Sequence, residues 1–445
     1  MMKSKVYTAV GAISVMCMIG GCRNNSEDVS IPMESVADDE ASNTEEVSTE
    51  TESVSSLTDE SNTALDIDYE IESYQNIQDF SYQLFSEQLE AENPVLSPTS
   101  AYLALAMAGF GSEGNTKAQF HQVLGEDMLA MSDHLMNMLP VDSERQILSL
   151  ANSAWIDDQY IVDEKWIGTI KSVMDAEAYQ TNLSTIETMD SMNGWIDEKT
   201  NGLIDKMLEK PLTDDARLVL FNTIYFKGKW CNPFEANDTY ADTFQVNDRE
   251  QLETNMMHKY SENLDYVSND FAEGLILPYR TDTEDHNIAM MALKPKGTDV
   301  REMYRQLSAD NVSELIDNRQ SILINTKIPK FEISFENGLN ESLINMGLID
   351  GFDAEKADFS LMGRTAGGYN LYISLVKQKA KIIVDEEGTE AAAATEVAML
   401  EGCALIEEEP IDVFFDEPFL YMIMDMDREI PLFIGILDNP AETND

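Results

Sequence analysis

Residues 218–226 are the stretch that most limits the folds open to this chain. Their sequence, L-V-L-F-N-T-I-Y-F, is almost continuously apolar over the length of one strand. A strand with apolar residues on both faces is typical of the middle of a sheet that is covered on both sides. The chain is therefore expected to build a large sheet with other elements packed against it.

The remaining elements follow from hydrophobic spacing and turn residues. Helices are predicted over residues 76–90, 99–110, 163–174, 190–207 and 339–346. Further strands are predicted over residues 148–156, 275–279, 287–293, 321–328, 331–335, 411–415, 420–426 and 432–437. Helices dominate the first third, strands dominate the last half, and no repeat of fixed period occurs, so a single large α+β domain is expected.

Composition and motifs exclude several classes of function. The 445 residues carry a net charge of −54, which argues against binding to nucleic acid or to anionic membrane surfaces. The sequence has no G-x-S-x-G, no H-E-x-x-H and no glycine-rich phosphate loop. The cysteines Cys17, Cys22, Cys231 and Cys403 show neither C-x-x-C nor metal-ligand spacing. We therefore expect no enzyme, no cofactor, no metal site and no disulfide framework.

The N-terminus has the layout of an export signal. Lys3 and Lys5 precede an apolar run over residues 6–20, and small residues stand immediately before Cys22. This arrangement resembles the lipobox of bacterial lipoproteins, which implies a signal peptide over residues 1–21 and a lipid anchor on Cys22. A simple cleaved signal with an incidental cysteine is the alternative. Residues 22–68 are acidic and lack any period, so they are expected to form a disordered tether that holds the domain off the cell surface.

Residues 381–406 allow two interpretations. The β-branched start predicts a strand, and the alanine-rich part that follows the glycine at 388 could form a short helix. Taken alternately, as in a strand, one face holds only small uncharged side chains and the other face carries both charges of residues 389–398. Such a segment could slide between existing strands and bury its small face.

Short motifs spread over the chain carry a family resemblance. They are Asn93-Pro94-Val95-Leu96-Ser97-Pro98 with Ser100; Asn222-Thr223-Ile224-Tyr225-Phe226-Lys227-Gly228-Lys229-Trp230 with Pro233-Phe234; Ile328-Pro329-Lys330-Phe331; Ala357-Asp358-Phe359-Ser360; residues 384–395; Phe415 with Pro418-Phe419; and Pro431-Leu432-Phe433-Ile434-Gly435. In this order and spacing they resemble the serpins over nearly all of residues 70–440. The resemblance implies a serpin domain over residues 69–440, with helices around a large central mixed sheet, two further sheets, and an exposed hinge and reactive loop over residues 385–410.

The resemblance also implies a mechanism. Serpins offer the loop as bait to a serine protease, and cleavage lets the loop insert as a new strand while the protease stays acylated. The hinge would be Glu386, Glu387, Gly388, Thr389, Glu390, Ala391, Ala392, Ala393, Ala394 and Thr395. Its small residues suit burial without overpacking, and Gly388 would supply conformational freedom. This pattern favours an inhibitory member; a non-inhibitory serpin acting as a binding or carrier protein is the alternative.

Further positions match residues around the point where the serpin sheet opens. They are Ser97, Ser100, Asn222, Trp230, Lys330 and Gln378. Trp230 matches the top of the sheet, and Lys330 and Glu386 match an ion pair at the base of the loop. Serpins usually carry histidine where this chain has Gln378, whose amide can still donate and accept hydrogen bonds.

The position of the cut bond is bracketed rather than fixed. Counting from the hinge as in serpins places it at Gly402–Cys403, and Cys403–Ala404 is one bond later. Counting back from Pro418 gives a later site, so the two counts span residues 402–407. No Lys or Arg lies between Lys381 and Arg428, which favours an elastase-like or subtilisin-like target over a trypsin-like one. Glu401 or Glu407 would instead suit a glutamate-specific protease. The target serine protease, held as a covalent acyl complex, is the expected partner of a monomeric inhibitor that contacts a membrane only through its lipid anchor.

Overall fold

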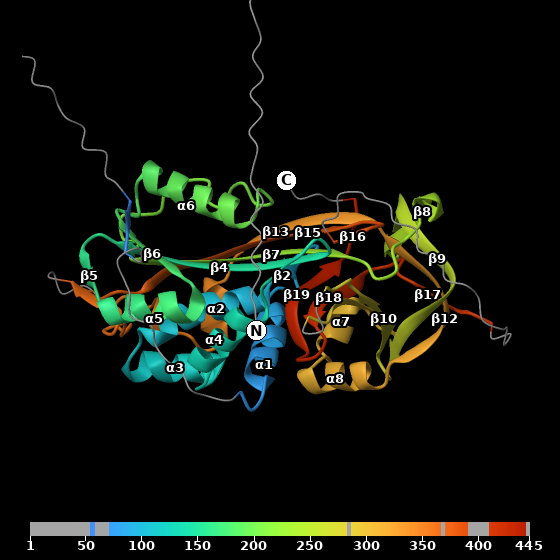
Figure 1. Cartoon of the computed structure of the whole chain (residues 1–445), viewed down its shortest axis with the longest axis horizontal. Helices are drawn as coiled ribbons and strands as arrows, with labels where there is room; N and C mark the ends of the chain where they lie inside the picture. The colour runs from blue at the N-terminus through green and yellow to red at the C-terminus, as the bar shows by residue number, and fades with distance from the viewer. Residues whose placement is uncertain (1–53, 58–70, 283–285, 366–369, 390–408, 442–445) are drawn as a thin grey trace, which may run out of the picture. The chain divides into compact units, whose positions relative to one another are not determined.

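The computed structural model describes residues 54–57, 71–282, 286–365, 370–389 and 409–441. Helices pack against two large sheets in this part of the chain (Figure 1). The helices are α1 (Gln75–Ser86), α2 (Pro98–Phe110), α3 (Gly114–Leu124), α4 (Met128–Met138), α5 (Glu164–Met174), α6 (Ile186–Lys199), α7 (Val300–Tyr304), α8 (Ala309–Asp317) and α9 (Asn340–Asn345), with 3-10 turns η1 (Ala236–Asp238) and η2 (Asp350–Phe352). None of the described helices is long and apolar enough to cross a membrane.

The first large sheet has eight strands and holds the predicted central strand near its middle. Its order is β1–β6–β4–β7–β16–β15–β13, and β3 pairs with β4. The strands are β1 (Ser55–Ser56), β3 (Val141–Asp142), β4 (Gln146–Asp157), β6 (Glu177–Thr181), β7 (Leu218–Lys229), β13 (Phe331–Gly338), β15 (Ile373–Val384) and β16 (Gly388–Thr389). Residues 218–226 are buried along their whole length, as their apolar run predicts.

The second sheet has nine strands and ends on the strand that follows residues 390–408. Its order is β17–β12–β9–β10–β11–β18–β19–β2, and β8 pairs with β9. The strands are β2 (Val95–Leu96), β8 (Thr239–Asn247), β9 (Glu250–Ser268), β10 (Ala272–Pro278), β11 (Ile288–Pro295), β12 (Gln320–Pro329), β17 (Ile411–Phe414), β18 (Phe419–Asp425) and β19 (Ile430–Leu437). A two-stranded sheet pairs β5 (Tyr160–Val162) with β14 (Gly363–Thr365).

The eight-stranded sheet is covered on both faces. Its inner face packs on the main core, which includes α2, a helix that is apolar all round and buried from Pro98 to Gly109. Its outer face packs under α6, where a second cluster includes Trp155, Met192, Trp195 and Phe221. Figure 1 shows α6 and α2 on opposite sides of this sheet. These two faces set the environment of every residue of the central strands.

The prediction of a helix over residues 190–207 was wrong at both ends. The helix α6 runs from Ile186 to Lys199, and Asn201 and Gly202 adopt positive φ angles of 53° and 79° that end it. The apolar residues beyond it still pack in the second cluster. Their backbone is held by the Asn193 side chain, which accepts from the N–H groups of Met207 and Leu208 at 2.9 and 2.8 Å. An amide side chain thus replaces the helical hydrogen bonds that the apolar spacing had suggested.

Part of the predicted tether is a strand in the structure. We expected residues 22–68 to lack structure, but β1 pairs antiparallel with β6 at the edge of the eight-stranded sheet. Val54 and Leu57 pack against the two apolar clusters, and the Leu57 N–H donates to the Ala178 carbonyl at 2.8 Å. Two single apolar residues carry too little pattern to predict a strand, because the partner edge is supplied by the fold. The elements α3, α4, β8 and β9 were also not predicted from the sequence.

Candidate functional site

The site is the junction between β7 and β15, which we name the seam. Among the described residues, these two parallel strands pair directly only at one end, where Leu218, Val219 and Leu220 meet Ile373, Leu375 and Val376. At the other end β16 lies between them. Gly388 pairs with Lys229, and Thr389 pairs with both Gly228 and Val384. The first two residues beyond the turn therefore already form a strand inside the sheet.

Gly388 is required by close approach of the backbone. A Cβ atom at this position would overlap the carbonyl oxygen of Gly228. Any other residue would therefore push β16 away from β7. The sequence had suggested glycine for the freedom of a hinge, whereas the structure shows a second, steric reason.

The turn that leads into β16 is closed by Asp385. Its Oδ1 accepts from the N–H groups of Glu387 and Gly388 at 2.9 and 3.2 Å, and its own N–H donates to the Gly388 carbonyl at 3.0 Å. Burial raises the pKa of the Asp385 carboxyl, and the two backbone hydrogen bonds oppose that effect. The turn fixes the direction in which the chain returns along the seam.

Thr389 is buried in an aromatic environment. Its side chain shares a hydrogen bond of 2.6 Å with the Tyr279 hydroxyl, and the residue is 1% exposed. The Tyr279 ring stacks on Trp230 at 4.4 Å between centroids and meets Phe226 edge-on at 4.9 Å. Burial raises the pKa of Tyr279, so the hydroxyl stays protonated and able to donate.

Backbone hydrogen bonds and one ion pair hold the acidic turn. The N–H groups of Trp230 and Phe234 donate to the carbonyls of Glu387 and Glu386 at 2.8 and 2.9 Å, and Trp230 Nε1 donates to the Asp385 carbonyl at 3.0 Å. Lys330 Nζ lies 2.8 Å from Glu386 Oε2. Burial raises the pKa of the Glu386 carboxyl, but the hydrogen bond and charge of Lys330, together with a hydrogen bond from the backbone, outweigh burial, so the pKa lies below its ordinary value.

Gln378 joins the seam to the start of α2. Its Oε1 accepts from the Ser97 N–H and its Nε2 donates to the Ser97 carbonyl, both at 2.8 Å. Ser97 is also the N-cap of α2, because its Oγ accepts from the Ser100 N–H at 3.3 Å. An amide can make both bonds to one backbone residue at once, with no dependence on protonation.

Asn222 lies across the seam from Gln378, on the inner face. Its Nδ2 donates to Oδ1 of Asn152, whose own Nδ2 donates to the Met174 carbonyl at 2.9 Å. Among the described residues no donor reaches Oδ1 of Asn222, although the residue is only 5% exposed. A buried acceptor without a partner is costly, and it is open to a donor on any strand that entered here.

The predicted site residues fall into two groups along the seam. Trp230, Lys330 and the turn into Thr389 meet at the end that holds β16, and Ser97, Ser100, Asn222 and Gln378 lie near the directly paired end. The hinge residues Glu390, Ala391, Ala392, Ala393, Ala394 and Thr395, the bond at Gly402, Cys403 and Ala404, and Cys22 lie outside the described residues. The sequence did not single out Tyr279 or Asn152, and Asp385 and Gly228 entered only as members of longer motifs, without a role of their own. Only the fold brings Tyr279 to Thr389, because the two lie 110 residues apart in the chain.

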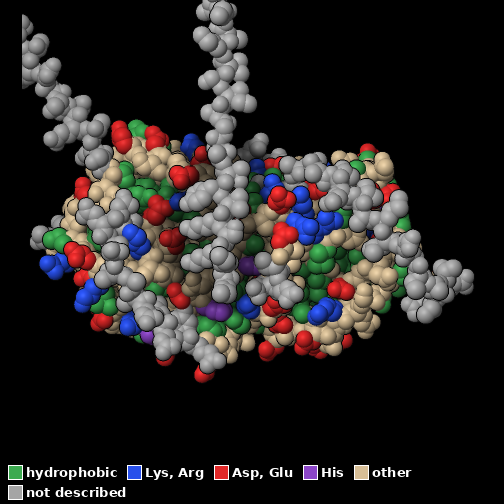
Figure 2. Space-filling view, viewed as in Figure 1, with side chains coloured by type: hydrophobic (Ala, Val, Ile, Leu, Met, Phe, Trp, Pro, Cys, Tyr) green, Lys and Arg blue, Asp and Glu red, His purple; other side chains and the backbone are tan. Residues whose placement is uncertain are grey.

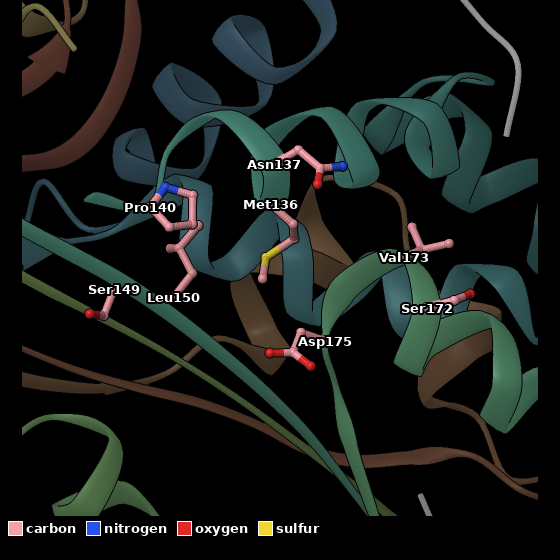
Figure 3. A pocket seen from close by; sticks show the side chains of 8 residues that line it. All are labelled: Met136, Asn137, Pro140, Ser149, Leu150, Ser172, Val173 and Asp175. Carbon is pink, nitrogen blue, oxygen red and sulfur yellow. The ribbon is translucent and has the colours of Figure 1, made fainter. Parts of the chain in front are cut away.

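The described residues outside the seam provide fewer groups that could bind or act on a ligand. A cavity of about 280 Å³ lies between α4, α5 and β4, where side chains from both helices and the strand surround it (Figure 3). It is lined by Met136, Asn137, Pro140, Ser149, Leu150, Ser172, Val173 and Asp175. Within the described ranges no three His, Cys, Asp or Glu residues are placed to hold a metal ion. On the face shown in Figure 2, acidic side chains are scattered among Lys and Arg.

Comparison with known proteins places this architecture. The family model described as serpin (serine protease inhibitor) matches residues 75–440. The chain belongs to the serpin family. An uncharacterized serpin-like protein of Methanosarcina acetivorans is 31% identical over 377 residues, covering 81% of this chain and 86% of the relative. The leukocyte elastase inhibitor of Xenopus tropicalis is 30% identical over 386 residues, covering 81% of this serpin and 97% of the relative.

Solved serpin structures distinguish conformational states. The thermophilic serpin tengpin in its native state matches with a TM-score of 0.79 and 30% identity, covering 87% of this chain and 99% of tengpin. Tengpin in its latent state matches with a TM-score of 0.69 and 29% identity, covering 84% and 99%. The described conformation of this serpin is therefore more similar to the native state than to the latent state.

Proposed function

We propose that this serpin is a suicide inhibitor of serine proteases, most suited to elastase-like or subtilisin-like enzymes. Serpins are in general protease inhibitors rather than enzymes, and the residues around the seam fit that role. The protease would cut the reactive loop, and the part of the loop that follows Thr389 would then insert as a strand between β7 and β15.

The observation that carries the proposal is the position of Thr389. This residue is already paired with β7 and β15, and its side chain is buried against Tyr279. An inserting strand would start from a register that exists before cleavage. The small uncharged residues that alternate after Thr389 in the sequence fit the buried inner face.

The chemistry is that of an interrupted acyl transfer. The protease serine attacks the carbonyl carbon of the bait bond, the peptide nitrogen leaves with a proton as a new amino terminus, and an ester joins the serpin to the protease. Water would complete the reaction by hydrolysing the ester. Insertion must be faster than that hydrolysis, because only the inserted state would hold the protease away from its working geometry.

The proposed target class rests on the sequence of the loop and on one relative. Gly402–Cys403 or Cys403–Ala404 is the proposed cut bond, since small apolar residues suit a shallow apolar pocket. The absence of Lys and Arg between Lys381 and Arg428 disfavours trypsin-like enzymes. The name of the frog relative, leukocyte elastase inhibitor, points in the same direction. A glutamate-specific protease that cuts after Glu401 or Glu407 is the competing target.

The cellular setting is a separate proposal. We infer export, lipid attachment at Cys22 and display of a monomeric inhibitor at the bacterial cell surface. Metabolic labelling with an alkyne fatty acid should mark the wild type and not a Cys22→Ser variant. Labelling of neither would leave a simple secreted protein, and labelling of both would place the lipid on a residue other than Cys22.

A protease panel tests the inhibitory function. We expect a covalent complex that survives SDS with an elastase-like or subtilisin-like enzyme, and mass spectrometry of the released C-terminal peptide should place the cut bond. Thr389→Arg should be cut without forming a complex, because insertion would then bury a charge beside Tyr279. Thr389→Ser is the matched control and should still form the complex. Cleavage of the wild type without any complex would instead support the carrier alternative.

A further inference from the structure

Lysines gather on the outer face of the seam. Strand alternation places Lys227 of β7 on the same face as Phe221, which packs under α6. It places Lys377, Lys379 and Lys381 of β15 on the same face as Leu375. The chain has only 29 Lys and Arg against 83 Asp and Glu. Composition alone therefore does not explain a row of lysines at the one place where a strand would enter the sheet.

The pairs made by Thr389 fix the register of any strand that continues from it. Thr389 pairs with Gly228 and with Val384, antiparallel to both neighbours. Each step forward along the loop is one step back along β7 and β15. One step places residue 390 opposite Lys227, and seven steps (389 to 396, 384 to 377) place residue 396 opposite Lys377. The next step reaches Leu220 and Val376, which are paired with each other, so the two registers agree.

Charge complementarity follows from this register. Residues 390 and 396 are Glu390 and Glu396, the only charged residues between Thr389 and Leu400. Both fall on the outer face, opposite Lys227 and Lys377. A shift of one residue would turn both carboxylates toward the buried inner face, where each would need a partner.

Lys377 is already held in place for such a contact. Its Nζ donates to the Met207 carbonyl and forms an ion pair with Glu336 of β13, and its side chain is 17% exposed. Partial burial strengthens a charge pair relative to one in bulk water. Lys379 and Lys381 would stand opposite Ala394 and Ala392, so they would add only diagonal attraction.

We propose that Lys227 and Lys377 are positioning residues that receive Glu390 and Glu396 when the cut loop inserts, and that they fix the register of the new strand. The proposal rests on the proposed function, because it concerns the inserted state. The occupant of the seam is the chain's own segment 390–396, which has the length of the stretch between Thr389 and the directly paired end.

Zero-length cross-linking tests the register directly. A carbodiimide joins a carboxylate and an amine in contact as an amide, and the water lost hydrates the carbodiimide to a urea. Protein cut in the loop should yield Glu396–Lys377 and Glu390–Lys227 cross-linked peptides, and uncut protein should yield no Glu396–Lys377 peptide. Cross-links from Glu396 to Lys379 and from Glu390 to Lys229, without the expected pairs, would show a register shifted by two residues and would overturn the proposal.

Charge swaps test whether the pairs matter for trapping. We expect Lys227→Glu and Glu390→Lys each to raise the number of inhibitor molecules consumed per trapped protease about two- to five-fold, since a cross-strand charge pair changes the insertion barrier only modestly. The double swap should restore the wild-type value. A double-mutant cycle of Lys377→Gln and Glu396→Gln should show a coupling in the free energy of unfolding of the cut protein and none in that of the uncut protein.

The matched control is Lys165→Glu, which makes the same charge change at an exposed residue in the first turn of α5. It should leave the consumption unchanged. Complex formation by the wild type with no rescue in the double swap would overturn the register proposal alone. A wild type that forms no complex and gains no heat stability on cutting would remove the proposed function, and this inference with it.

Discussion

The hydroxyls of Thr389 and Tyr279 share one hydrogen bond inside the sheet, at 2.6 Å. Removing the Tyr279 hydroxyl would leave the Thr389 hydroxyl buried without that partner. We expect Tyr279→Phe to lower the free energy of unfolding by about 1–2 kcal/mol. Denaturant unfolding followed by fluorescence measures this change.

Tyr240→Phe is the matched control for that prediction. The Tyr240 hydroxyl also bonds a second hydroxyl, that of Tyr260, at 2.6 Å, but Tyr240 is 46% exposed. Water can replace the lost partner there, so a change close to zero is expected. An equal decrease in the free energy of unfolding of the two variants would show that burial of the Thr389 hydroxyl does not determine how much its hydrogen bond stabilises the fold.

Lys259 should make the free energy of unfolding depend on pH in the alkaline range. Burial lowers the pKa of its ammonium from 10.5 to about 8, although Glu262 and Glu235 oppose that effect. Its Nζ donates to the Pro233 carbonyl at 2.6 Å and lies 4.6 Å from the centre of the Phe234 ring. Between pH 8 and 10.5 the unfolded chain holds the proton and the folded chain does not, so stability should rise with pH across that window.

The contribution of Lys259 is measured as the difference in the free energy of unfolding between the wild type and a variant without this ammonium. Unfolding of the wild type and of Lys259→Met is compared between about pH 7.5 and 10.5, the range set by the folded and unfolded pKa values. The wild type should gain stability relative to the variant as the pH rises. A difference that stays constant over this range would show that Lys259 titrates normally.

Among the elements, β1 is the one whose removal should affect the smallest part of the fold. It covers the free edge of β6 with a few residues only, and Leu57 donates to the Ala178 carbonyl. Replacing residues 54–57 by Gly-Ser-Gly-Ser should remove the apolar contacts of Val54 and Leu57. We expect amide exchange over Glu177–Thr181 to become about ten-fold faster, because local opening of an edge strand needs less free energy than global unfolding.

Hydrogen exchange with mass spectrometry measures the β1 effect, and β19 serves as the internal reference. That strand lies in the other large sheet and should keep its wild-type exchange rate. Unchanged exchange in β6 would show that β1 does not protect the edge. Faster exchange everywhere would show a global loss of stability instead.

For the whole molecule, cutting the loop should stabilise rather than weaken the fold. An inserted strand would add pairing to both β7 and β15 in the middle of the eight-stranded sheet. We expect the melting temperature of the cut protein to rise by roughly 10 °C or more, as several kcal/mol of new pairing and burial would require. Scanning calorimetry of cut and uncut protein tests this.

Cut Thr389→Arg protein is the comparison for the melting experiment. It has the same broken bond, but an arginine cannot take the buried place of Thr389 without leaving its guanidinium unpaired beside Tyr279. Residue 389 should therefore leave the sheet already in the uncut variant, and the rise on cutting should be small or absent, because insertion would have to bury that charge. An equal rise in both proteins would mean that insertion does not begin at Thr389. No rise in the wild type would favour the carrier alternative.

The sequence by itself determined the type of most long elements, and it predicted which residues form the hinge. The apolar run at 218–226 predicted a central strand, which the structure confirms, and the small residues after Gly388 predict a strand that forms only after cleavage. Local patterns suffice in such cases because the period of apolar residues and the size of side chains are properties of neighbouring residues.

Only the tertiary structure decided how the hinge is held. The overlap that requires glycine at 388 comes from the Gly228 carbonyl, the partner of Thr389 is a tyrosine far away in the chain, and the backbone beyond α6 is held by the side chain of Asn193. β1 exists because another strand presents a free edge. Each of these depends on which distant segments the fold brings together, and no local period in the sequence encodes that contact.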